Sequence, residues 1–177
     1  MMMTPTTFEP KIIKNACSKT YLDMFMHFIP SVELWDDEQI AEEDYDKINL
    51  TKLNLIEHGH FKNPMLAGIA VGLMSQIYDA GGKDYFTPEM HFCGISLKDK
   101  STEVNLHTDN WDENKLKVLG ILNSDWKKTY GGGFEHGGVL LSPEPGDFIV
   151  FDPRVPHKAQ DIFTDKKRIA IDWTIRK

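Results

Sequence analysis

The sequence contains little cysteine and no excess of basic residues. Its two cysteines, Cys17 and Cys93, lie far apart among 177 residues, so they form neither a disulfide framework nor the paired spacing of a zinc finger. We therefore expect a reducing, cytoplasmic location. The formal net charge is −7, which argues against a general surface for duplex nucleic acid, because such a surface needs clustered Lys and Arg. We do not expect a nucleic-acid partner.

Long apolar runs and targeting signals are absent as well. The longest apolar stretch, residues 64–77, is too short and too interrupted by glycine to span a bilayer, so we expect no membrane partner. Residues 1–11 lack the basic segment followed by an apolar run that marks a signal peptide. The chain has no internal repeat or linker-like segment, and its length suits one domain with a sizeable core. We expect a single domain over residues 1–177.

The first half of the chain carries helical signals. Residues 15–29 place apolar side chains at helical spacing and end at Pro30, with Asn15 or Ser18 as the N-cap. Residues 63–82 read as a second helix, which Asn63 caps and a glycine pair ends. The acidic stretch between them reads as a solvated loop or helix face. We expect residues 1–87 to form a helical support region.

The second half, residues 88–177, carries strand signals. Short runs rich in Ile, Val and Phe alternate with turn residues, and no helical pattern separates them. The runs are "EMHFCGISL", "KLKVLGIL", "GGVLLS", "DFIVFD" and "RIAIDWTI". Short strands at this spacing favour an antiparallel sandwich or barrel. The fold class we expect is mainly β, with the N-terminal helices packed on one outer face of the β-core.

The chain contains a single His-x-Asp, formed by His107 and Asp109. With 7 histidines and 16 aspartates in 177 residues, about 0.6 such pairs are expected by chance, so the motif alone carries little weight. If "VNLHTDN" ends a strand, however, the two side chains point to the same side and could bind one metal ion. His157 is the candidate third ligand, because it begins a strand after a proline-containing turn in the β-half.

Two imidazoles and one carboxylate suit non-haem Fe(II), which keeps positions open for a bidentate co-substrate and O₂. Zinc is less favoured, because its catalytic sites more often use three His, or two His and a Glu. Arg168 opens the last apolar run, and its planar fork could hold a dicarboxylate co-substrate through two charge-assisted hydrogen bonds. Alternation places Ala170, Asp172 and Thr174 on the same strand face as Arg168.

The order His107-x-Asp109, His157, Arg168 resembles that of the iron- and 2-oxoglutarate-dependent oxygenases. The segment "LGILNSDWKKTYGGGFE" is similar to the "LN-x-x-W … GG" segment of their prolyl 4-hydroxylase-like branch, which includes the prolyl hydroxylases of oxygen sensing. The segment "PEPGDFIVFDPRVPHKAQ" is similar to the strand–turn–His segment of that branch. The resemblance covers roughly residues 90–176 in the expected order.

This resemblance implies a double-stranded β-helix, also called a jelly roll, over residues 88–177. It implies that His107, Asp109 and His157 bind Fe(II) and that Arg168 pairs with the distal carboxylate of 2-oxoglutarate. O₂ and 2-oxoglutarate would be co-substrates, and the enzyme would hydroxylate a C–H bond while it releases succinate and CO₂. The substrate would be a peptide or a small molecule, and a prolyl residue in a peptide is one candidate.

The sequence departs from the family pattern at several positions of the co-substrate pocket. Ile121 stands where relatives often have a tyrosine before the "LN", and Ser96-Leu97 where some have a second tyrosine. Ala170 replaces a common Ser or Thr, so Arg168 has less hydroxyl support, and Thr174 is a candidate helper. Trp111 follows the ligand pair and could contact substrate or pack within its loop.

Two other functions use the same motifs. One is nucleic-acid demethylation on the same fold. The other is a non-catalytic, cupin-like module that binds a metal or ligand, which the missing tyrosine at Ile121 favours. The remaining candidates read as structural: His58 and His60 lie in a polar loop, His91 and His136 fall on expected strands, and the glycines of "YGGG" serve a turn.

Overall fold

The computed structural model describes residues 7–29, 47–48, 51–109 and 112–177. Within these residues the chain is mainly β, with two α-helices and strands that pair antiparallel throughout. The acidic stretch that the sequence places between the helices lies outside the described residues. Neither described helix is both long and apolar enough to cross a membrane.

The largest sheet has seven strands in the order β1-β10-β7-β12-β5-β3-β4. Their bounds, in that order, are Lys11–Ile13, Phe148–Phe151, Lys115–Ile121, Arg168–Arg176, Thr87–Lys98, Thr51–Glu57 and His60–Phe61. A smaller sheet has the order β11-β8-β9, with bounds His157–Ala159, Phe134–His136 and Val139–Leu141. Strands β2 and β6, at Lys47–Ile48 and Glu103–Val104, form a separate pair.

The two helices begin at polar caps, as the sequence predicts. Helix α1, Lys19–Phe28, is capped by Ser18, whose side chain accepts a hydrogen bond from the backbone of Tyr21. Helix α2, Pro64–Ala80, is capped by Asn63, whose side chain accepts from the backbone of Leu66. Short 3₁₀ turns lie at Gly82–Asp84 and Lys128–Tyr130.

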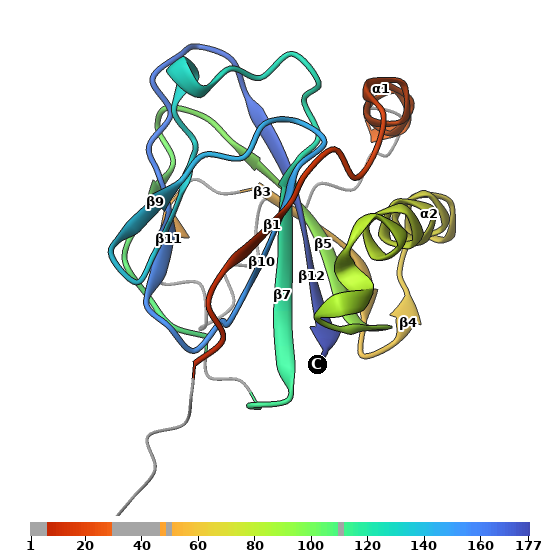
Figure 1. Cartoon of the computed structure of the whole chain (residues 1–177). Helices are drawn as coiled ribbons and strands as arrows, with labels where there is room; N and C mark the ends of the chain where they lie inside the picture. Colours follow the sequence, from red (N-terminus) through yellow and green to blue (C-terminus); the bar gives the residue numbers. More distant parts are fainter. Residues whose placement is uncertain (1–6, 30–46, 49–50, 110–111) are drawn as a thin grey trace, which may run out of the picture.

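The large sheet buries a different set of side chains on each face. Along β12, Ile169, Ile171, Trp173 and Ile175 belong to the main core, which also contains the buried side of α2. Because side chains alternate along a strand, Arg168 and every second residue after it point to the opposite face. Figure 1 shows both helices on one side of the large sheet and β9 and β11 on the other. The polar face of β12 therefore looks toward the smaller sheet.

The first half of the chain also contributes strands that the sequence analysis did not predict. Strand β1 pairs with β10 and strand β3 pairs with β5, so both join the large sheet. Strand β1 has three residues, too few for a readable alternation, and the partners of both strands lie far along the chain. All five apolar runs of the second half do contain strands: β5, β7, β9, β10 and β12. A division of the chain at residue 87 stays a prediction.

Candidate metal centre

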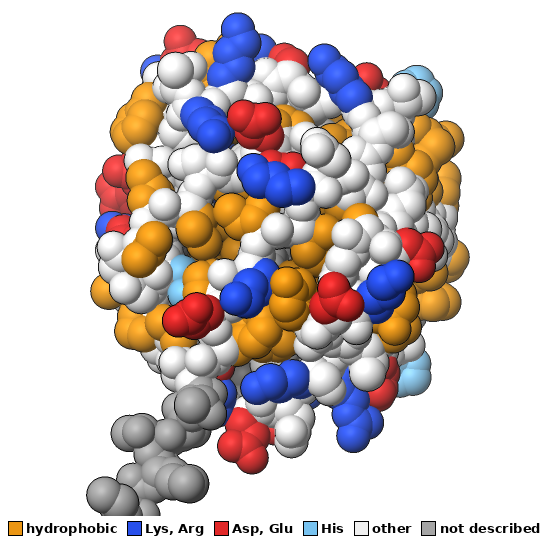
Figure 2. Space-filling view, viewed as in Figure 1, with side chains coloured by type: hydrophobic (Ala, Val, Ile, Leu, Met, Phe, Trp, Pro, Cys, Tyr) orange, Lys and Arg blue, Asp and Glu red, His pale blue; other side chains and the backbone are white. Residues whose placement is uncertain are grey.

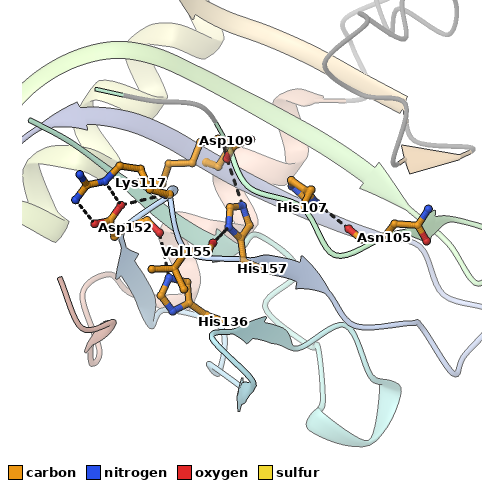
Figure 3. Close-up of polar contacts among 10 residues, drawn as sticks. Asn105, His107, Asp109, Lys117, His136, Asp152, Val155 and His157 are labelled. Atoms are coloured by element: carbon orange, nitrogen blue, oxygen red, sulfur yellow. Dashed lines mark hydrogen bonds and ion pairs between the residues drawn. The ribbon is translucent and has the colours of Figure 1, made fainter. Parts of the chain in front are cut away.

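His107, Asp109 and His157 come together between the sheets. Each offers one ligand atom, and these three atoms lie within 4.8 Å of one another. His157 is buried at the start of β11, and the other two are half-buried in the segment that follows β6. Figure 3 shows the ring of His157 directed at the carboxylate of Asp109, with His107 beside them. Residues fifty positions apart in sequence thus meet at one point.

Backbone hydrogen bonds hold this meeting point. The amide of His107 donates to the carbonyl of His157 at 3.1 Å, and the amide of His157 donates back at 2.8 Å. The amide of Asp109 donates to the carbonyl of Pro153 at 2.9 Å. The expected strand around the His-x-Asp is reduced to this single bridge, yet the bridge has the same effect: it aims both side chains toward His157.

The orientation of both imidazoles suits metal binding. The Nδ1 atom of His107 lies 2.8 Å from the carbonyl oxygen of Asn105, and Nδ1 of His157 lies 2.7 Å from that of Val155. A carbonyl oxygen only accepts, so Nδ1 must carry the hydrogen in each ring. In the neutral tautomer the lone pair is then on Nε2, which is the arrangement of metal-binding histidines with an oriented second nitrogen.

Lys117 stands beside the candidate ligands, and the sequence analysis missed it. Its ammonium nitrogen lies 3.0 Å from Oδ2 of Asp172 and 3.6 Å from Oδ2 of Asp109. Burial opposes the charged form of Lys117, but Asp172 and Asp109 outweigh burial and raise its pKa. Lys117 is therefore a stable cation that links the ligand Asp109 to strand β12. The sequence did contain a signal for Lys117. The alternation in "KLKVLGI" places it on the same strand face as Ile121, a position of the expected co-substrate pocket.

His136 is near the three residues but does not join them. It is buried, its Nε2 lies 3.1 Å from the carbonyl oxygen of Asp152, and its ring stacks on His157 at 6.3 Å between centroids. Burial lowers its pKa, which favours the neutral ring. Asp152 in turn forms an ion pair with Arg154 at 2.7 Å. His136 thus packs against His157, in agreement with the structural role that the sequence predicts for it.

Arg168 is buried at the start of β12, on the polar face of that strand. Its Nη1 donates a hydrogen bond to the carbonyl oxygen of Gly132, while its buried Nε has no hydrogen-bond partner among the described residues. Burial lowers its pKa to about 10. Lys98, a second buried cation that the sequence analysis missed, is its partner in the register of β5. Asp172 pairs with Lys117 and not with Arg168.

The other predicted pocket residues are placed differently. Ile121 is buried and lies opposite Ala170, next to the start of β12. Thr174 is buried opposite Lys117, six residues beyond Arg168, or about 20 Å along a strand. At that separation Thr174 and Arg168 cannot hold the same carboxylate, so this role for Thr174 is corrected. Trp111 lies outside the described residues.

No protein-family model matches the sequence, and no curated protein matches it. Solved structures do. A Pseudomonas putida prolyl-4-hydroxylase has a TM-score of 0.69 at 15% identity, covering 97% of this chain and 94% of that chain. A Trichoplax adhaerens prolyl hydroxylase, in complex with a peptide of the hypoxia inducible factor oxygen degradation domain, has a TM-score of 0.66 at 17% identity, covering 94% and 83%.

A third solved structure carries ligands. HygX from Streptomyces hygroscopicus, with nickel and 2-oxoglutarate bound, has a TM-score of 0.70 at 11% identity, covering 96% of this chain and 83% of that chain. At these identities the likeness establishes the fold. This chain therefore has the fold of the 2-oxoglutarate- and Fe(II)-dependent oxygenases, including prolyl hydroxylases.

Proposed function

We propose that this chain is a non-haem iron(II)- and 2-oxoglutarate-dependent dioxygenase that hydroxylates a C–H bond. The observation that carries the proposal is the meeting of one ligand atom each from His107, Asp109 and His157 within 4.8 Å, in a fold shared with such oxygenases. We place the site in a double-stranded β-helix core over residues 88–177, with residues 1–87 as its support, in a single domain.

The donor set fits Fe(II). Two neutral imidazoles and a carboxylate on one face form the ligand set of non-haem Fe(II) oxygenases and leave positions for co-substrates. When bound, the iron couples the oxidative decarboxylation of 2-oxoglutarate by O₂, which yields succinate and CO₂, to the transfer of one oxygen atom into a substrate C–H bond. His107 and His157 would contribute Nε2, because carbonyl oxygens hold their Nδ1 atoms.

The protein side of the mechanism is orientation and charge. Lys117 holds the carboxylate of Asp109 against rotation and connects it to Asp172 on β12. Arg168 offers a buried guanidinium at the start of the same strand, where it would grip the distal carboxylate of 2-oxoglutarate. Phe134 and Phe151 pack against the ring of His157, so one side of the site is closed to water.

A peptide is the first substrate class to test. Two of the three solved structures named above are prolyl hydroxylases, and one of these is in complex with a peptide. A prolyl residue within a peptide is therefore our first candidate, and a small molecule the second. Figure 2 shows basic and acidic side chains of the described residues interspersed on one face, which does not favour a nucleic-acid substrate on that face.

Spectroscopy of anaerobic protein tests the proposal directly. We expect wild-type protein with Fe(II) to develop a visible charge-transfer band on addition of 2-oxoglutarate, and to release succinate and CO₂ once O₂ is admitted. The variant His107→Ala should lose both signals. His60→Ala is the matched control, because His60 is exposed on β4 and should retain both. If metal-loaded wild-type protein binds no 2-oxoglutarate, the proposed activity is wrong.

A non-catalytic binding module remains the second candidate. Ile121 favours it, because this buried apolar side chain takes the place of a hydroxyl that often supports the co-substrate in the resembling family. Metal analysis of protein prepared without O₂ separates the two functions. Tightly held zinc, without a charge-transfer band on addition of Fe(II) and 2-oxoglutarate, would establish the module.

A further inference from the structure

Two buried cations face one another where β5 ends and β12 begins. Lys98 ends β5, Arg168 begins β12, and the two residues are direct partners in the register of these strands. Only 1% of Lys98 and 5% of Arg168 is exposed. Partners in an antiparallel pair point to the same face, where like charges directly opposite destabilise the sheet. Burial of each charge adds a further cost.

No acidic side chain among the described residues lies within 4.0 Å of either cation. Asp161 favours the charged form of Lys98 from farther away, and Lys158 opposes it. Burial, followed by the charge of Arg168, lowers the pKa of Lys98 to about 8. No carboxylate of the described residues therefore pairs directly with either of these two buried cations.

The hydrogen bonds of both cations lead to the same place. The ammonium group of Lys98 donates to the carbonyl oxygen of Gln160 at 2.9 Å, and the guanidinium of Arg168 donates to that of Gly132. These two acceptors lie on adjacent segments, because the amide of Gln160 donates to the carbonyl of Gly133 at 2.8 Å. Lys98 and Arg168 thus reach from the large sheet to the same end of the smaller sheet, where β11 ends and β8 begins.

Donors remain for an additional acceptor. An ammonium group has three N–H donors and a guanidinium has five. Lys98 donates one hydrogen bond, and the buried Nε of Arg168 has no partner in the described part of the chain. Gly132 allows this approach: a Cβ there would lie 3.0 Å from both Cδ and Nη1 of Arg168. Because Gly132 has no side chain, the guanidinium packs against the backbone there, while its Nε has no partner among the described residues.

We propose that Lys98 is a second cation for the distal carboxylate of a 2-oxo dicarboxylic acid, which it holds together with Arg168. This inference rests on the proposed function and adds to it a residue of this chain. A carboxylate between the two cations removes their repulsion and accepts from the free Nε of Arg168. The ammonium group of Lys98 supplies, from β5, the support that a hydroxyl at Ile121 would otherwise supply from β7.

Binding to Ni(II)-loaded protein, measured by calorimetry, tests the role of Lys98. The two probes are 2-oxoglutarate and 2-oxopentanoate, which has the same 2-oxo acid group but a methyl group in place of the distal carboxylate. We expect Lys98→Met to weaken 2-oxoglutarate about 10- to 100-fold, as loss of a charge-assisted hydrogen bond should, and to leave 2-oxopentanoate within about twofold. Lys98→Arg is the control that keeps the charge, and it should recover most of the affinity.

The outcomes separate this inference from the proposed function. If wild-type protein binds neither probe, both fail. If wild-type protein binds 2-oxoglutarate and Lys98→Met binds it within twofold of wild type, the inference alone fails. An equal loss for both probes would also overturn it, because a purely structural role of Lys98 would affect the two alike.

A measurement on wild-type protein serves if the variants do not fold. The charged groups that face Lys98 are Arg168 from β12, together with Lys158 and Asp161 in and after β11. Protonated Lys98 binds the distal carboxylate, so the preference for 2-oxoglutarate over 2-oxopentanoate should fall several-fold between about pH 7 and about pH 9.5. The ratio removes effects of metal ligation, which both probes share. A ratio that stays constant over this range would contradict the proposal.

Discussion

His107 and His157 exchange both of their backbone hydrogen bonds, so one candidate metal ligand holds the other in place. The two rings lie 4.6 Å apart between centroids, and Asp109 completes the group two residues later. Backbone hydrogen bonds, and not the side chains of the three residues, position this part of the chain. Substitution of a single ligand side chain should therefore change metal affinity without dissolving the site.

Asp109→Asn tests the carboxylate ligand. The amide keeps the shape of the side chain but removes its charge, so we expect the dissociation constant for Mn(II) to rise by about 100-fold or more. Titration followed by electron paramagnetic resonance measures free Mn(II). Asp112→Asn is the matched control, because the carboxylate of this exposed residue accepts from the backbone of Asn114 and lies outside the candidate ligand group. Equal losses in the two variants would indicate a general charge effect and exclude Asp109 as a ligand.

Lys117→Met tests the cation that forms ion pairs with both Asp109 and Asp172. In metal-free protein we expect this variant to lower the free energy of unfolding by about 1–3 kcal/mol, because it leaves two half-buried carboxylates without their shared partner. Urea unfolding in the presence of a chelator measures the change.

The matched control for Lys117→Met is Lys62→Met. Lys62 forms an ion pair with Glu57 at 3.3 Å on the surface, so its loss should change stability by no more than about 0.5 kcal/mol. Addition of Ni(II) should restore part of the stability of Lys117→Met, because the metal replaces the missing positive charge beside Asp109. A metal-free Lys117→Met protein as stable as wild type would show that the ion pairs do not support the site.

Gly132→Ala tests the close approach of Arg168 to the backbone. Gly132 has φ +72°, and Gly138, the matched control, has φ +80°. Alanine at either position should cost about 1–2 kcal/mol from the left-handed backbone alone. At Gly132 the added Cβ would also lie 3.0 Å from Arg168, whereas at Gly138 it meets nothing within 4 Å.

We therefore expect the free energy of unfolding to fall by about 1–2 kcal/mol more in Gly132→Ala than in Gly138→Ala. Gly132→Ala should also bind 2-oxoglutarate more weakly than wild type. Urea unfolding and calorimetry provide the two readouts. Identical stability losses in the two variants would mean that Arg168 can move away from Gly132 at no cost.

Lys98→Met should stabilise the protein when no ligand is present. Burial and Arg168 lower the pKa of Lys98 to about 8, below its ordinary value of 10.5. In the unfolded chain this lysine binds its proton up to a higher pH, so it costs stability at neutral pH, and the cost fades between about pH 8 and about pH 10.5. We expect Lys98→Met to raise the free energy of unfolding by about 1–3 kcal/mol at pH 7, reduced by the loss of the hydrogen bond to Gln160. This gain in stability should disappear near pH 10.

Unfolding in urea at both pH values measures the gain. A variant that is more stable but binds 2-oxoglutarate more weakly would show that Lys98 serves binding at the expense of stability. A destabilised variant at pH 7 would instead show that the contact with Gln160 outweighs the cost of the buried charge.

Local patterns in the sequence were sufficient to predict many of the helices and strands. Asn63 and Pro64 predict the start of α2, because a cap and a first-turn proline act within a few residues. The apolar runs of β5, β7, β10 and β12 were readable, since alternation or continuous burial is a local property of each strand. The order of His107, Asp109, His157 and Arg168 was also sufficient to predict a metal site and its co-substrate, and the structure brings the first three together.

Only the tertiary structure decided which side chains stand opposite one another. Lys98 faces Arg168 because of the register of β5 with β12, and Lys117 reaches Asp109 and Asp172 because β7 lies on the other side of β12. Alternation within one strand fixes the face on which a side chain lies, whereas its partner residue depends on pairing with strands far apart in the chain. Sequence alone therefore determined which residues could form the site, whereas the pairing of strands determined which charges surround it.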